Sequence, residues 1–158
     1  MHVLPDTSRP VELLLVEDNA VDVRLTIEAL RDGKGANRLS IVSDGVEGLL
    51  YLRRARQYAQ AQRPDLVLLD LNLPSMDGRE LLAEIRNGPE LRSIPVAIVT
   101  ASASEQDQRE AERLGAICYV TKPIGVDELI RVVMLVQDFA ITVISVPPRR
   151  APKTAVVA

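Results

Sequence analysis

The sequence is poor in the residues that most often support redox, metal or relay chemistry. Its 158 residues include no tryptophan, one cysteine and one histidine. Cys118 has no partner for an internal disulfide, which fits a reducing compartment. His2 lies near the start of the chain, and it cannot supply the phosphorelay histidine of a helix bundle. The chemistry of this protein must therefore rest on other side chains.

Long apolar runs are also missing. The most apolar stretch, residues 132–146, is interrupted by Gln137 and Asp138, and nothing approaches the ~20 residues of a membrane helix. The first ten residues lack the basic-then-apolar layout of a signal peptide. We therefore expect a cytoplasmic chain without a membrane anchor.

An excess of basic residues is absent as well. Nineteen Lys and Arg stand against 22 Asp and Glu, and three of the basic residues lie in 147–158. The preceding residues therefore carry more acid than base, which excludes a general attraction to nucleic acid. Hydrophobic residues make up 47% of the chain, enough for one full core without metals or disulfides.

What the sequence does contain is a regular alternation of short apolar runs and amphipathic stretches. Hydrophobic periodicity and helix-breaking residues predict five strands and five helices. The strands are expected at residues 11–16, 39–42, 66–69, 95–99 and 116–120, and the helices at 20–31, 46–61, 78–87, 104–114 and 126–136. Residues 1–10 and 147–158 are expected to be flexible ends.

Strand–helix alternation predicts right-handed crossovers and a parallel sheet covered on both faces. Function in such sheets lies at the carboxyl ends of the strands. Acidic, hydroxyl and ammonium groups follow four of the predicted strands: Glu17 and Asp18, Asp70, Thr100, and Lys122. The topology should gather them at one edge.

These residue types indicate a hard cation and a phosphoryl group. Clustered carboxylates repel one another unless a cation joins them, and oxygen ligands favour Mg²⁺. Asp70, at the end of the central strand, is the candidate nucleophile that would become an aspartyl phosphate. Lys122 would neutralise charge on the transferring group, and Thr100 could donate a hydrogen bond to it.

Four motifs then resemble the receiver domain of two-component response regulators. They are VEDN at 16–19, LLDLNLP at 68–74 followed by Asp77-Gly78, VTA at 99–101 and YVTKP at 119–123. The match in type, order and spacing covers about residues 11–137. The resemblance implies a flavodoxin-like α/β fold, a three-layer (βα)5 sandwich with sheet order 2-1-3-4-5.

The same resemblance implies roles for individual residues. Asp70 would be the phosphoacceptor. Asp18, Asp70 and the Asn72 carbonyl would ligate Mg²⁺, with Glu17 acting through water. Lys122 would form an ion pair with the phosphoryl group. The family has the peptide bond between this lysine and the following proline in cis. Thr100 and Tyr119 would form the switch.

Several of these residues also have plain structural interpretations. Glu17 and Asp18 could be acids favoured at a helix N-terminus. Ser102 with Glu105 fits a capping box, and Tyr119 could be ordinary core.

A narrower resemblance is to stand-alone regulators of bacterial phytochrome histidine kinases. It is carried by residues 51–63 and by residues 138–147 of the C-terminal tail 138–158. The apolar tail is expected to be extended and to pack across a homodimer interface. Phe139, Ile141 and Val143 are the predicted interface residues. Such regulators usually have Phe-Trp where this chain has Phe139-Ala140.

The predicted function is that of a single-domain response regulator, not an enzyme. A histidine kinase would phosphorylate Asp70, and output would be dimerisation, kinase feedback or transfer to a histidine phosphotransfer protein. The alternatives are a haloacid-dehalogenase-like phosphatase, a flavin-binding flavodoxin-like protein and an unphosphorylated scaffold. The phosphatase family requires a second aspartate where this chain has Asn72, and Glu17-Asp18 would repel a flavin phosphate.

Overall fold

A computed structural model describes residues 10–32 and 36–145, with side-chain surroundings described as far as residue 135. The strands are β1 (Val11–Val16), β2 (Asn37–Val42), β3 (Leu66–Leu69), β4 (Val96–Thr100) and β5 (Cys118–Thr121). The helices are α1 (Ala20–Asp32), α2 (Gly45–Leu52), α3 (Gly78–Asn87), α4 (Glu105–Arg113) and α5 (Val126–Ser145), with a 3₁₀ turn at Arg56–Tyr58.

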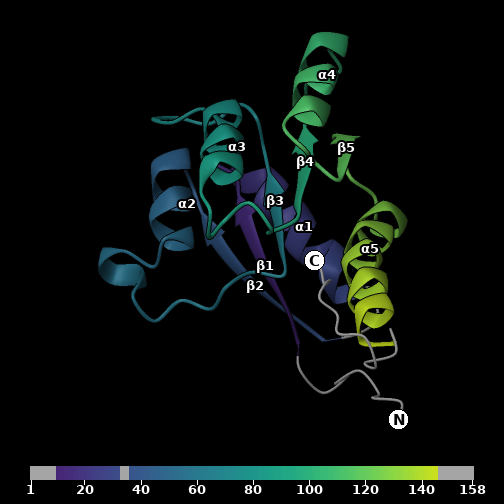
Figure 1. The fold of residues 1–158 in the computed structure, drawn as a ribbon. Helices are drawn as coiled ribbons and strands as arrows, with labels where there is room; N and C mark the ends of the chain where they lie inside the picture. The colour runs from purple at the N-terminus through teal and green to yellow at the C-terminus, as the bar shows by residue number, and fades with distance from the viewer. Residues whose placement is uncertain (1–9, 33–35, 146–158) are drawn as a thin grey trace.

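The strands form one parallel sheet in the order β2-β1-β3-β4-β5 (Figure 1). This confirms the predicted flavodoxin-like order. β1, β3 and β4 are buried along their whole length, as continuous apolar strands covered on both faces should be. The chain reverses strand order between β1 and β3, which leaves an open edge above their carboxyl ends.

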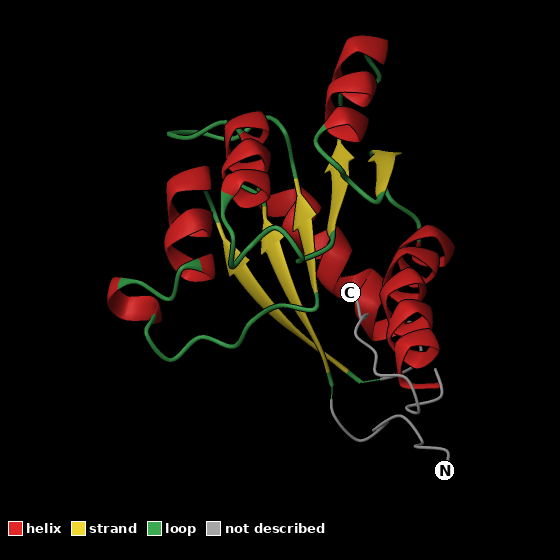
Figure 2. Ribbon diagram, in the orientation of Figure 1, coloured by secondary structure: helices red, strands yellow, loops and turns green. Residues whose placement is uncertain are grey.

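Helices cover both faces of the sheet, so that the domain has three layers (Figure 2). α2 and α3 pack on one face, with Leu81, Leu82 and Ile85 buried there. α1 and α5 pack on the other, with Leu129 and Val132 buried. The alternating side chains of the strands supply the middle of both cores.

The second helix is shorter than the sequence predicts. The expected helix 46–61 ends at Leu52, because Arg54 and Arg56 adopt φ values of 54° and 56°. The following segment turns back onto α2, where the ring of Tyr58 lies 5.3 Å from that of Tyr51. Good local helix formers therefore give way to a tertiary contact.

The last helix is longer than predicted, and the extended conformation expected for the apolar tail is wrong as far as Ser145. α5 continues through Gln137 and Asp138. Both residues are polar, but each keeps the backbone N–H that a helix requires. The first residue after them that lacks this N–H is Pro147. Val146 lies outside the described residues.

The capping box expected at Ser102 is also wrong. Ser104 caps α4 instead, and its side chain accepts a hydrogen bond from the Asp107 N–H. Ser102 lies two residues before Ser104, and its hydroxyl donates to the Asp107 carboxylate. No helix within the described ranges is long and apolar enough to cross a membrane.

Candidate functional site

Three acidic side chains meet at the carboxyl edge of the sheet. Glu17 and Asp18 follow β1 directly, and Asp70 follows β3 directly. The two strands are neighbours, with Val16 in register with Leu69. One carboxylate oxygen from each acid lies within 4.8 Å of the others. Glu17 and Asp70 are buried, whereas Asp18 is exposed, so the cluster opens to solvent on one side.

Lys122, directly after β5, reaches into this cluster. Its Nζ lies 2.7 Å from Glu17 Oε1 and 3.0 Å from Asp70 Oδ2. The peptide bond that follows, Lys122-Pro123, is cis, as the resemblance implies. The Lys122 N–H donates to the Thr100 carbonyl across the last strand pair. The sheet therefore brings an ammonium group from its edge strand to the central acids.

The third partner of Lys122 is Asp22, which sequence reasoning did not select. Its Oδ2 lies 2.7 Å from Nζ. Asp22 is in the first turn of α1, four residues after Asp18. That i, i+4 spacing was the available signal, because it places the residue over the same helix end as the acidic pair.

The two buried acids have opposite pKa shifts. Burial raises the pKa of Glu17 to about 7; the Lys122 hydrogen bond opposes this effect, and the Asp70 charge adds to it. Burial also acts to raise the pKa of Asp70, but hydrogen bonds from Lys122, Thr100 and the Asn72 N–H outweigh it and lower that pKa below its usual value. Asp70 is thus held ionised, as a nucleophilic carboxylate must be.

Hydrogen bonds fix the orientation of the Asp70 carboxylate. The buried Thr100 hydroxyl donates to Oδ1 at 2.8 Å, and the Asn72 N–H donates to the same oxygen at 3.2 Å. The other oxygen, Oδ2, accepts a hydrogen bond from the Lys122 ammonium. The side chain of Asn72 itself is exposed, so its described contribution to the cluster is through the backbone.

Gly78 brings the start of α3 directly against the Asp70 strand end. A Cβ at this position would lie 2.1 Å from the Asp70 carbonyl oxygen, so only glycine permits the approach. The Gly78 N–H donates to the Leu71 carbonyl at 2.9 Å, and Asp77 caps the helix with a capping box. The Asp77-Gly78 pair therefore closes the loop that carries Asp70.

The donor set fits a hard divalent cation. It consists of carboxylate oxygens alone, gathered on one open side, and Mg²⁺ or a similar ion takes one or two carboxylates and keeps several waters. Glu17, Asp18 and Asp70 would hold such an ion. Its chemistry there would be to neutralise charge on a phosphoryl group.

Comparison with known families decides the identity of this fold and site. The family model of the response regulator receiver domain matches residues 13–134. The chain belongs to the response regulator receiver family. It is 37% identical over 142 residues to response regulator Rcp1 of Synechocystis, covering 90% of this chain and 97% of that protein.

Solved structures of receivers are similar to this chain in fold and in sequence. A phosphorylated cyanobacterial phytochrome response regulator, RcpA, is 43% identical, with a TM-score of 0.73 over 83% of this chain and 94% of its own. The Mn²⁺-bound form of Rcp1 is 38% identical, with a TM-score of 0.72 over 87% and 99%. Receivers of this family signal without being enzymes, and they bind a divalent metal.

The predicted switch tyrosine of this receiver is connected to the loop after β4. The Tyr119 hydroxyl donates to the Ser102 carbonyl at 2.9 Å, and the ring packs against the α2–α3 side of the core. The Ser102 hydroxyl donates to Asp107, which also binds Arg79. Tyr119 therefore has a core contact and a polar contact to the loop that directly follows Thr100.

The remaining predicted residues are assigned to a dimer interface and not to this site. Phe139, Ile141 and Val143 lie in the last turns of α5, where the structure describes the backbone and not the side chains.

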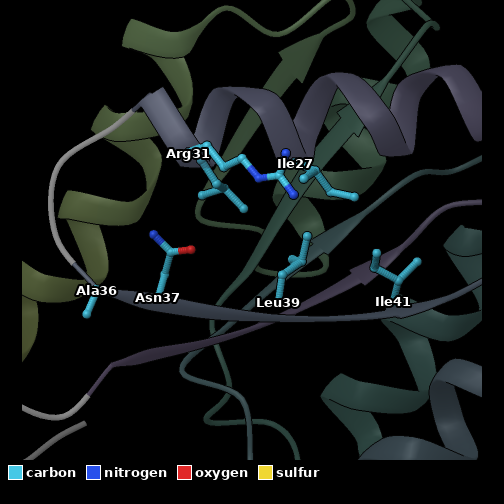
Figure 3. A pocket seen from close by; sticks show the side chains of 7 residues that line it. Ile27, Arg31, Ala36, Asn37, Leu39 and Ile41 are labelled. Atoms are coloured by element: carbon cyan, nitrogen blue, oxygen red, sulfur yellow. The ribbon is translucent and has the colours of Figure 1, made fainter.

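A cavity of about 510 Å³ lies between α1 and β2. Figure 3 shows its mostly apolar lining, with Arg31 and Asn37 as its polar members. These residues come from the last turns of α1, from Ala36 directly before β2, and from β2 itself, and none of them belongs to the acidic cluster.

Proposed function

We propose that Asp70 accepts a phosphoryl group from a histidine kinase. One observation carries this assignment. Asp70 is buried and ionised, with Thr100 and Asn72 bound to one oxygen and Lys122 to the other. An oxygen of this carboxylate would form the O–P bond as the P–N bond of the kinase's phosphohistidine breaks. The electron pair of that bond stays on the imidazole nitrogen.

The surrounding residues then have distinct tasks. Lys122 stabilises negative charge on the transferring oxygens, because an ammonium already placed there costs no reorganisation. The Thr100 hydroxyl donates a hydrogen bond either to Asp70 or to a phosphoryl oxygen. Tyr119 transmits that change to the loop after β4. Glu17, Asp18, Asp70 and the Asn72 carbonyl are the proposed Mg²⁺ ligands. With these groups the chain assists its own phosphorylation and dephosphorylation.

A phytochrome-type histidine kinase is the proposed donor. The support is that similar receivers, RcpA among them, are phytochrome response regulators. A cytoplasmic location is consistent with this role and with the single cysteine.

Output is proposed to be through protein contact, by a homodimer and by transfer to a histidine phosphotransfer protein. The homodimer is supported by the exposed Met134 and Leu135 of α5 and by the apolar residues that follow them. Phe139, Ile141 and Val143 are the proposed interface residues.

Intact-mass measurement after incubation with acetyl phosphate tests the acceptor. With Mg²⁺ we expect wild type to gain one phosphoryl group, and with a chelator to gain none. Asp70→Asn should gain none in either case, because its amide is not a nucleophile. Asp127→Asn, at an exposed aspartate in the first turn of α5, is the matched control and should behave as wild type.

Two outcomes would overturn the assignment. One is phosphorylation of the Asp70→Asn variant. The other is no gain in wild type from acetyl phosphate or from a phosphorylated phytochrome-type kinase. If the donor proposal is right, that kinase should transfer faster than a histidine kinase of another sensory class, by about a hundredfold in kcat/KM.

A further inference from the structure

Asp22 is the one described partner of the Lys122 ammonium that lies outside the acidic cluster. An ammonium group has three N–H donors, and here they meet Glu17, Asp22 and Asp70 at 2.7, 2.7 and 3.0 Å. Burial lowers the pKa of Lys122, but the hydrogen bonds to these three carboxylates, Asp22 first, raise it above its usual range. Each donor therefore has a carboxyl oxygen as its acceptor.

The position of Asp22 is set independently of the cluster. Its N–H donates to Asn19 Oδ1 at 3.0 Å, and its carbonyl accepts the Thr26 hydroxyl at 2.9 Å. A carboxylate in the first turn of a helix is further stabilised by the helix dipole. The backbone of Asp22 is thus fixed within α1, while Lys122 comes from the end of β5.

A divalent cation changes the other two contacts. Glu17 and Asp70 belong to the group whose oxygens lie within 4.8 Å of one another. When these oxygens bind a doubly charged ion, their charge is compensated, and the ion repels the nearby ammonium. Asp22 then remains as the carboxylate whose charge is still available to Lys122.

We propose that Asp22 is a positioning residue, which keeps the Lys122 ammonium beside Asp70 when the acidic cluster holds a divalent cation. This inference rests on the proposed function, in which Lys122 acts on the transferring phosphoryl group. Without Asp22, Lys122 would lose its fixed position at the moment when the site becomes competent. A displacement of about 1 Å in a catalytic group can slow a reaction up to about a hundredfold.

Lysine-specific ¹⁵N labelling tests the proposal without reference to activity. The chain contains only three lysines, Lys34, Lys122 and Lys153, and Lys122→Arg assigns the signal of interest. In wild type the Lys122 ammonium should stay protected from hydrogen exchange with and without saturating Mg²⁺. In Asp22→Asn it should stay protected in metal-free protein, and exchange at least about tenfold faster once Mg²⁺ is added.

Two further variants separate position from charge. Asp22→Glu keeps a carboxylate on the same turn and should restore protection in Mg²⁺. Glu28→Gln removes the same charge from an exposed site on α1 and should leave wild-type behaviour. Protection that persists in Mg²⁺-saturated Asp22→Asn overturns the proposal. So does its loss from metal-free Asp22→Asn, since Glu17 and Asp70 would then not hold the ammonium.

The phosphorylation rate provides the second measurement. At saturating Mg²⁺, and at a temperature at which both proteins are fully folded, Asp22→Asn should be phosphorylated about tenfold more slowly than wild type. In a Lys122→Ala background the same substitution should have no further effect on the rate, because Asp22 acts through Lys122. If wild type gains no phosphoryl group at all, the proposed function fails, whereas the ammonium measurement still decides the role of Asp22.

Discussion

At the scale of single residues, Glu17 links the acidic cluster to folding stability. Its pKa rises from the ordinary 4.5 to about 7 in the folded, metal-free protein, chiefly through burial. Between these values the native state holds a proton that the unfolded chain has released. The stabilising contribution is therefore complete below 4.5 and is lost as the pH rises through about 7.

Glu17→Gln cannot ionise, so it should not lose this contribution. In the presence of a chelator we expect its free energy of unfolding, relative to wild type, to increase across that pH range by on the order of 2 kcal/mol. Urea unfolding of both proteins at a series of pH values measures the difference. Parallel pH profiles would show that Glu17 keeps an ordinary pKa.

At the scale of elements, a paired arginine and aspartate join the N-terminal ends of α3 and α4. Arg79 donates from Nε to Asp107 Oδ1 at 3.1 Å and from Nη2 to Oδ2 at 2.7 Å. Ser102 and Arg79 together lower the pKa of Asp107. The Ser102 carbonyl also accepts a hydrogen bond from the Tyr119 hydroxyl. The Arg79–Asp107 pair therefore connects α3 to the loop that follows the site.

We expect Arg79→Gln and Asp107→Asn each to lower the free energy of unfolding by about 1 kcal/mol. The double variant should lose less than the sum of the two, since the residues share one interaction. Arg113→Gln breaks an exposed pair within α4, with Glu110, and should cost less. Denaturant unfolding provides all four values, and strictly additive losses would contradict the coupling.

At the scale of the whole molecule, the proposed homodimer rests on the described apolar surface of α5. The Met134 and Leu135 side chains are nearly half exposed, 46% and 48%, and the helix continues for ten residues beyond Leu135. Light scattering at micromolar concentration should give the mass of two chains. Leu135→Glu should raise the dimer dissociation constant at least about tenfold, because it would bury an unpaired charge.

Val46→Glu is the matched control for that experiment. Val46 is 41% exposed, but it lies on α2, on the other side of the sheet. A wild-type monomer, or equal weakening by both substitutions, would contradict an α5 interface.

Much of this molecule follows from local pattern. Continuous apolar strands alternating with amphipathic helices are sufficient to predict a parallel sheet, because no other arrangement buries both faces of each strand. That topology places residues after β1, β3 and β5 at one edge, so Glu17, Asp70 and Lys122 could be grouped without any contact being known. The length of α5 would also have been predicted correctly if its end had been assigned from Pro147 and not from the polar residues Gln137 and Asp138.

Other features depend on side-chain contacts that the hydrophobic pattern does not specify. The end of α2 is set by Tyr58 folding onto Tyr51, where local propensity alone favours a longer helix. The bond between Asp22 and Lys122 joins residues 100 positions apart, and the spacing of Asp22 from Asp18 places Asp22 at the helix end without specifying Lys122 as its partner. The sequence by itself determines which elements form and which edge collects the charged groups. The tertiary structure decides which carboxylate each ammonium hydrogen meets and which acid stays ionised, because burial and distance are properties of the packed chain.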